Sequence, residues 1–148
     1  MDTLETPLGT LWVAAGEDGL EHVSFRELPG ARSPSPVVYE ARAQLAAYFA
    51  GDLDRFDLPL APRGTEFQRL VWEEVARIPY GDTSTYAAVA AAVGRPTACR
   101  AVGAANGRNP LPIVVPCHRV VGTAGALTGY GGGLDRKRAL LDLERAGG

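Results

Sequence analysis

The stretch TSTYAAVAAAVGRPTACRAVGAANG, residues 83–107, decides the fold of the C-terminal half of this chain. Thr83 or Ser84 is expected to cap a helix that runs to Val93, because short hydroxyl side chains favour the first position of a helix. Gly94 then has the place of the left-handed residue that ends many helices. Thr97 is expected to cap a second helix after a short turn. Two short helices joined by such a turn predict a helix-turn-helix unit.

The second of these helices has an unusual surface. It carries Ala and Gly at most positions and one long side chain, Arg100, near its start. A helix that reads base sequence in the major groove presents Arg, Asn or Gln to the base edges. Small residues instead allow close approach, so the pattern fits either sequence-independent docking in the minor groove or tight packing in a core.

The elements around this stretch suggest two domains. A support domain with a small sheet is predicted for residues 1–62, and a mainly helical domain for residues 63–148, with the boundary in a Pro-rich segment. Period-two and helical apolar patterns predict strands over 10–15 and 21–25, and helices over 37–50, 67–78 and 135–144. Thr65 is expected to cap the helix over 67–78. The fold class is therefore α+β.

Charge is divided unevenly between these two domains. The chain has a formal charge of −2, made of −6 in residues 1–62 and +4 in residues 63–148. No acidic residue occurs from Thr83 to Leu134, whereas four arginines fall inside: Arg95, Arg100, Arg108 and Arg119. Either a polyanion such as DNA approaches this half, or the charges are segregated by chance.

Composition excludes several classes of protein. The 148 residues are 46% hydrophobic and 22% charged, as in ordinary globular domains. No segment approaches the roughly 20 apolar residues that span a bilayer, and the acidic N-terminus does not resemble a signal peptide, so a cytoplasmic protein without membrane contact is expected. Two cysteines and two histidines without zinc spacing predict reduced thiols and no metal site.

Residues 113–121, IVVPCHRVV, are the candidate active-site segment. The β-branched run predicts a strand that Pro116 interrupts directly before Cys117. A reactive thiol needs a base, and His118 is adjacent, although consecutive strand residues face opposite ways unless the strand has ended or a water bridges them. The orienting acid is open among Asp135, Asp142, Glu144, Glu66, Glu73, Glu74 and Asp82.

Several blocks of this sequence, in one order, resemble the O6-alkylguanine-DNA alkyltransferases. They are EFQRLVWEEVARIPYGDTSTYAAVAAAVGRPTACRAVG (66–103), the following AANGRNPLPIVV (104–115), PCHRV (116–120) and GALTGYGGGLDRKRALLDLE (125–144). The resemblance is weaker in TPLGTLWVAAGEDGLEHVSF (6–25). It implies a small N-terminal ribonuclease H-like α/β domain and a C-terminal winged helix-turn-helix domain that carries the active-site cysteine.

The resemblance also implies roles for individual residues in a DNA repair reaction. Cys117 matches the acceptor that takes the alkyl group from O6-methylguanine, and also from O4-methylthymine, irreversibly and once per molecule. His118 resembles the base that acts on the thiol through a water, and Glu144 the carboxylate that orients it. Asn109 matches a hinge asparagine before the active-site segment. Tyr86 matches a tyrosine that hydrogen-bonds guanine N3 as the alkyl group leaves.

Further positions follow from the same resemblance. Arg100 matches the finger that replaces the flipped nucleotide, approached from the minor groove. DNA contacts are implied for Arg100, Tyr86, Thr97, Ala98 and Thr123, and pocket positions for Tyr130, Gly131 and Val120. Gly131 stands where the family more often has Ser, Ala or Arg, which predicts a wider pocket. The resemblance implies a monomer that acts on double-stranded DNA with no cofactor and no metal.

Three alternatives compete with this interpretation. An alkyltransferase-like module senses alkylguanine without repairing it, but such proteins carry Trp at the acceptor position, where this chain has Cys117. A thiol hydrolase built on Cys117, His118 and Glu144 would leave Tyr86 and Arg100 unexplained. A transcription factor would need a second helix able to read bases, which the Ala and Gly positions argue against.

Overall fold

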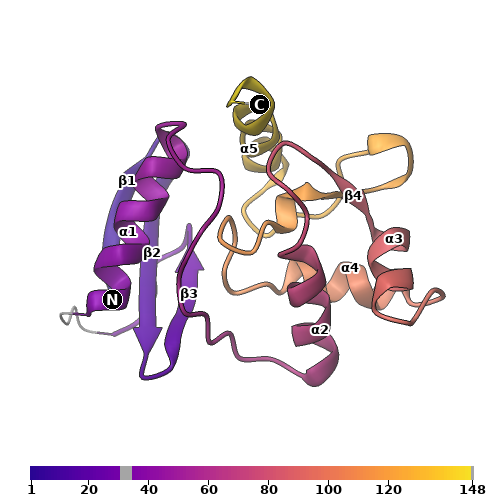
Figure 1. Cartoon of the computed structure of the whole chain (residues 1–148), viewed down its shortest axis with the longest axis horizontal. Coiled ribbons are helices and arrows are strands. Elements are labelled where there is room, and N and C mark those ends of the chain that lie inside the picture. The colour runs from indigo at the N-terminus through magenta and orange to yellow at the C-terminus, as the bar shows by residue number, and fades with distance from the viewer. Residues whose placement is uncertain (31–34, 148) are drawn as a thin grey trace. The chain divides into compact units, whose positions relative to one another are not determined.

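The computed structural model describes residues 1–30 and 35–147 of the chain (Figure 1). The chain divides into two compact units, Met1–Arg63 and Gly64–Gly148, each with its own helices and strands. None of the helices in the described ranges combines the length and the hydropathy of a membrane-spanning segment.

The first unit is a three-stranded antiparallel sheet with one helix packed on it. The strands are β1 (Asp2–Thr6), β2 (Gly9–Gly16) and β3 (Gly19–Ser24), in the order β1-β2-β3. Helix α1 (Pro36–Phe49) lies against the sheet (Figure 1). It buries Val38, Ala41, Leu45 and Tyr48. Strand β1 was not predicted, because its sequence DTLET contains a single large apolar residue and none of its positions is fully buried.

The second unit is mainly helical. Its helices are α2 (Glu66–Val75), α3 (Tyr86–Ala92), α4 (Cys99–Gly107) and α5 (Leu134–Gly147). Two short strands, β4 (Ser84–Thr85) and β5 (Val120–Val121), pair in parallel, and two 3-10 turns, η1 (Cys117–Arg119) and η2 (Thr123–Gly125), flank β5. Helices α2, α3 and α4 pack on one another, with the Trp72 indole donating a 2.8 Å hydrogen bond to the carbonyl of Ala105.

The helix ends agree with the sequence in part. Thr65 caps α2 in a capping box with Gln68, and Gly94 takes a left-handed φ of 79° after α3, both as predicted. The cap of α3 is Thr85, not Thr83 or Ser84, and its side-chain oxygen accepts from the Ala88 amide at 3.1 Å. The prediction that Thr97 caps the next helix was wrong, since α4 begins after Ala98 without any side-chain cap.

The expected strand over residues 113–121 is mostly a loop. Only Val120 and Val121 form a strand, while Ile113 and Val114 lie in a turn in which Ile113 has a φ of 75°. The Asn109 side chain holds this turn, donating to the Val115 carbonyl at 2.9 Å and accepting from the Leu111 amide at 2.9 Å. The β-branched side chains are buried without a strand ladder, so their hydrophobicity is satisfied by packing alone.

Candidate active site

Cys117 occupies a buried turn and has 4% of its surface exposed. Pro116 has φ −79° and ψ 64°, the conformation of an inverse γ-turn, and the Cys117 amide closes that turn with a 2.7 Å hydrogen bond to the Val115 carbonyl. Pro116 thus redirects the chain into η1, the 3-10 turn that Cys117 begins. The backbone amide and carbonyl of Cys117 are thus both hydrogen-bonded, the amide in this turn and the carbonyl by the Asn106 side chain.

The thiol of Cys117 resists ionisation. Burial raises its pKa from the ordinary 9.0 to about 11, although a hydrogen bond from the Asn109 side chain and the positive charge of Lys137 oppose this change. At neutral pH the sulfur is therefore protonated. A nucleophilic role requires a base that takes the proton during the reaction.

His118 is that candidate base. Its Nε2 lies 2.7 Å from the Glu144 Oε2, and both side chains are buried. Burial lowers the pKa of His118, with Glu144 opposing the change, so the imidazole is neutral at physiological pH. Because an ionised carboxylate only accepts hydrogen bonds, Nε2 carries the ring proton and Nδ1 keeps a lone pair. Among the described residues, the buried Nδ1 has no hydrogen-bond partner.

Glu144 is also bound by the next residue of η1. Arg119 donates from Nε to Oε1 at 2.8 Å and from Nη2 to Oε2 at 2.9 Å, while its Nη1 donates to the Ile78 carbonyl at 2.7 Å. The guanidinium lies over the ring of Tyr80, 5.7 Å from its centroid. We call Cys117, His118, Arg119 and Glu144 the buried cluster. It links η1 to the last turns of α5.

A second set of residues lies beside the thiol and fixes the glycine-rich loop. Lys137 is fully buried and donates from Nζ to the carbonyls of Val120 and Thr128, each at 2.7 Å. Burial lowers the pKa of Lys137, and the nearby Cys117 opposes this change. Tyr86 donates to the same Thr128 carbonyl at 3.0 Å, and Lys137 Nζ lies 5.9 Å from the Tyr86 ring centroid. Helix α3, the loop and α5 therefore meet at one carbonyl.

The loop also carries the predicted pocket tyrosine. The Tyr130 hydroxyl is buried without a hydrogen-bond partner among the described residues, and burial and Cys117 both raise the pKa of Tyr130 well above its usual value. A Cβ at Gly131 would lie 3.6 Å from the Gly107 carbonyl, so the loop closely approaches the end of α4. The structure thus brings Tyr130, Val120 and Lys137 together with Cys117, and places Gly131 beside α4.

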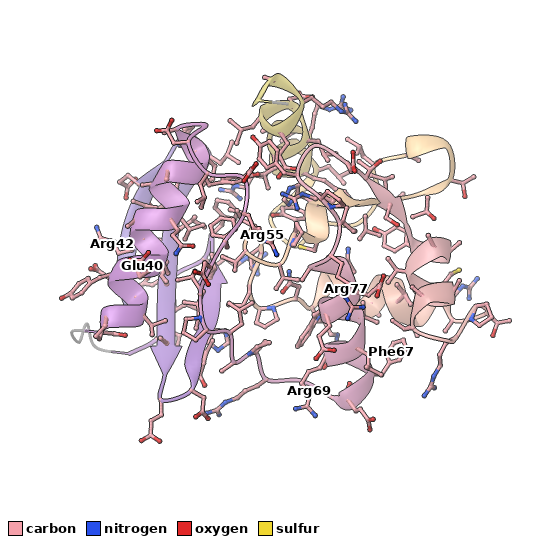
Figure 2. All side chains as sticks on the ribbon, in the orientation of Figure 1. Glu40, Arg42, Arg55, Phe67, Arg69 and Arg77 are labelled. Carbon is pink, nitrogen blue, oxygen red and sulfur yellow. The ribbon has the colours of Figure 1, made fainter. Side chains whose placement is uncertain are left out.

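Apart from Tyr86, which lies against the glycine-rich loop, the residues predicted to contact DNA lie at the surface of the second unit. Arg100, Thr97 and Thr123 are exposed and Ala98 is half-buried, whereas α4 buries Val102, Ala105 and Asn106 on its other side. The guanidinium of Arg95 lies 5.6 Å from the ring centroid of Phe67. In Figure 2, Phe67 leaves α2 on the side of α3 and α4, and Arg69 leaves it on the opposite side.

Three residues of the site were not predicted as site residues. Lys137 stands three residues before Leu140 on the apolar face of α5, and a lysine in a buried stripe is a recognisable signal. Asn106 donates to the Cys117 carbonyl at 3.2 Å, from a helix face that looked like simple packing. Arg119 was noted only as one of four arginines in the stretch without acidic residues. In the described parts of the chain, no group of His, Cys, Asp and Glu could hold a metal ion.

Fold and site together define a helix-turn-helix protein with a buried Cys-His-Glu arrangement, and comparisons with known proteins agree. Two family models match the chain: the ribonuclease-like domain of 6-O-methylguanine DNA methyltransferase over residues 1–62, and its DNA binding domain over residues 66–146. Together they span nearly the whole sequence. The chain belongs to the 6-O-methylguanine DNA methyltransferase family.

Individual relatives are similar along their whole length. The methylated-DNA–protein-cysteine methyltransferases of Methanosarcina barkeri and Bacillus subtilis are 49% and 48% identical, over 97% of this chain and 95% and 93% of those proteins. The crystal structure of Mycobacterium tuberculosis O6-methylguanine methyltransferase has a TM-score of 0.88 at 47% identity, covering 99% of this chain and 92% of that one. The structure of the Mycobacterium tuberculosis protein OGT in complex with DNA has a TM-score of 0.89 at 48% identity, covering 98% and 92%.

Proposed function

We propose that Cys117 is the residue that receives the alkyl group in this DNA repair protein, which removes alkyl groups from O6 of guanine in double-stranded DNA. The observation that carries this proposal is the 2.7 Å contact between His118 and Glu144, beside a buried thiol. It gives the thiol a neutral base whose free nitrogen is buried with it. The names of the relatives support the reaction, and the complex of one relative with DNA supports the partner.

The transfer follows from the protonation states of the site. The thiol proton passes to Nδ1 of His118 through a water, and Glu144 stabilises the imidazolium that forms. The sulfur electron pair forms the new S–C bond while the C–O6 bond breaks and its electrons pass into the guanine ring. When DNA is bound, the Tyr86 hydroxyl turns from the Thr128 carbonyl to guanine N3, donates its hydrogen bond there and so stabilises the leaving group. The product is a thioether, which does not revert, so each molecule reacts once.

Access to O6 requires the nucleotide to leave the base stack, which costs a few kcal/mol. Helix α4 has the small side chains that allow close approach to the minor groove, and its Arg100 is exposed at the first turn. An inserted Arg100 offsets part of the cost by filling the gap that the base leaves. The exposed Thr97 and Thr123, with the half-buried Ala98, serve as backbone contacts that fix the position of the duplex.

The proposal extends to the range and setting of the reaction. Gly131 adds no side chain to the pocket loop, so we expect O6-alkyl groups larger than methyl to be accepted, and O4-methylthymine as a second substrate. Transfer from O6-benzylguanine that is far slower than methyl transfer would contradict the wide pocket. Since transfer to a protein's own cysteine needs neither cofactor nor second subunit, we propose a monomer that works on DNA in the cytoplasm.

Intact and peptide mass spectrometry tests the central proposal. The protein is mixed with a duplex oligonucleotide that contains one O6-methylguanine. We expect the Cys117 peptide to exchange one hydrogen for one methyl group and the reaction to stop at one transfer per protein. The Cys117→Ala variant should bind the duplex and gain nothing, whereas Cys99→Ala, which changes the chain's other free thiol, should react like the wild type.

Two results would overturn the proposal. Binding of the lesion with no mass gain on wild-type protein would indicate a sensing module instead of a repair protein. Repeated turnover of a small ester or peptide by Cys117 would indicate a thiol hydrolase.

A further inference from the structure

We propose that Arg119 is a positioning residue for alkyl transfer: by gripping both oxygens of Glu144, it fixes which ring nitrogen of His118 is free to take the thiol proton. This inference rests on the proposed function, because the base it describes serves Cys117. Arg119 does not touch the thiol or the predicted substrate pocket in any contact described above. Its effect would pass through Glu144.

Arg119 binds the carboxylate of Glu144 in a bidentate geometry, in which two guanidinium nitrogens contact the two carboxylate oxygens. Two parallel contacts of 2.8 and 2.9 Å join Arg119 to the two oxygens of Glu144, whose side chain is 1% exposed. The third guanidinium nitrogen is held by the Ile78 carbonyl at 2.7 Å, and the Tyr80 ring covers the guanidinium. Arg119 therefore cannot turn, and neither can the carboxylate.

The positive charge of Arg119 affects the protonation of His118, the proposed base. A buried carboxylate that has no cation beside it either becomes protonated itself or favours protonation of a neighbouring base. In the pair of His118 and Glu144, an added proton has two places: on the imidazole, or on Glu144 with the carboxyl then donating to Nε2. In both forms Nδ1 of His118 carries hydrogen and cannot accept the thiol proton. Arg119 supplies the charge that keeps the added proton off the pair.

The charged groups around His118 agree with this balance. Glu144, on α5, raises the pKa of His118, whereas Arg119 on η1 and Lys137 on α5 lower it; Cys117 is neutral at physiological pH. Removing Arg119 would leave Lys137 as the sole cation of this set. We therefore expect His118 to hold its proton to higher pH in a variant without the charge.

The test compares the pH dependence of methyl transfer in three variants under single-turnover conditions. Arg119→Gln should transfer methyl at least about tenfold more slowly than wild type at neutral pH. Its rate should recover as the pH rises by one unit or more, because each pH unit below the pKa of a base lowers the fraction of unprotonated base about tenfold. Arg119→Lys keeps the charge but loses the bidentate geometry, so it should be several-fold slower with the wild-type pH profile. Arg145→Gln, at an exposed arginine of α5, is the matched control and should match wild type.

A measurement without DNA separates this inference from the proposed function. Two-bond nitrogen–proton NMR spectra report the tautomer and titration of His118 in free protein. We expect Nε2–H in wild type and Arg119→Lys, and Nδ1 protonation at neutral pH in Arg119→Gln.

The inference fails if His118 titrates alike in wild type and Arg119→Gln, or if that variant is equally slow at every pH. If Arg119→Gln does not fold, an Arg119→Lys rate equal to wild type overturns the positioning role. Absence of transfer in wild type would contradict the proposed function and leave the NMR outcome to decide this inference.

Discussion

In the proposed function, the buried cluster carries alkyl transfer and the outer face of α4, around Arg100, carries contact with DNA, and the two regions are built in opposite ways. In the cluster, Arg119 and His118 bind both oxygens of Glu144 at 2.7 to 2.9 Å, and all three side chains are nearly inaccessible. On α4, Arg100 is exposed and the helix begins without a side-chain cap. Alkyl transfer requires side chains in fixed positions. Binding to DNA of any sequence requires a surface whose side chains do not clash with any base pair.

The comparison also predicts where substitutions are costly. Breaking a buried charge pair leaves the other charge without solvent or partner, so the whole fold is affected. Changing an exposed residue affects what it touches and little else. The three predictions below test this difference, from the largest expected effect to the smallest.

Glu144→Gln should produce the largest loss of stability. It removes the charge that Arg119 and His118 both bind, so we expect the free energy of unfolding to fall by about 3–5 kcal/mol, measured by urea denaturation. Asp142→Asn is the control, because Asp142 is exposed on the same helix and lies 4.0 Å from Arg145. That variant should stay within about 0.5 kcal/mol of wild type. Equal losses in the two variants would show that the cluster is no more critical than the surface.

The second prediction concerns Cys117 and alkaline pH. The pKa of Cys117 is raised from 9.0 to about 11 in the folded protein, so the folded state keeps a proton that the unfolded state loses. Its contribution to stability is complete below about pH 9 and lost as the pH rises toward 11, a change of about 2–3 kcal/mol. We therefore expect the free energy of unfolding of wild type, relative to that of Cys117→Ala, to fall by about 2–3 kcal/mol between pH 9 and pH 11.

Cys99→Ala provides the contrast for that measurement. Cys99 is half-exposed at the start of α4, so its removal should leave the alkaline decline of wild type unchanged. An equally steep decline in Cys117→Ala would mean that the buried thiol is not the group responsible.

The smallest effect is expected on the outer face. Arg100→Ala should leave the free energy of unfolding within about 0.5 kcal/mol of wild type, because the side chain is exposed. Methyl transfer from duplex DNA should slow by about tenfold, or about 1.4 kcal/mol in the barrier, while transfer from single-stranded DNA changes less because no base pair must open. Arg69→Ala, on the opposite side of α2 from Phe67, is the control (Figure 2). Equal slowing on both substrates would contradict the role of Arg100 in flipping.

The outer face could be predicted from the sequence because its signals are local. The left-handed Gly94, the Ala and Gly positions of α4 and the apolar period of α2 all act within a few residues of one another. The short strand β4 before α3 was missed because its pairing with β5 depends on a segment more than 30 residues further along the chain. The roles of Thr97, Ala98 and Thr123 at DNA stay predictions.

The buried cluster could be predicted only in part. Cys117 and His118 are adjacent, but residue patterns alone left the acid open among seven residues, and only the family resemblance pointed to Glu144. The fold brings Glu144 to His118 although 26 positions separate them in the chain. The turn around Ile113 was missed because β-propensity describes side-chain packing, whereas here Asn109 and three prolines determine the backbone. Nothing in the local pattern showed that Arg119 would point at Glu144 instead of solvent.

The position of Glu144 in α5 has a consequence for biosynthesis. A ribosome makes Cys117, His118 and Arg119 in succession, and Glu144 follows only after the glycine-rich loop and most of α5. Until that helix has left the ribosome and docked, the nascent chain has the Cys117 thiol without the carboxylate that lies 2.7 Å from His118 in the folded protein. Under the proposed mechanism, an unfinished chain therefore cannot yet use the single reaction available to each molecule.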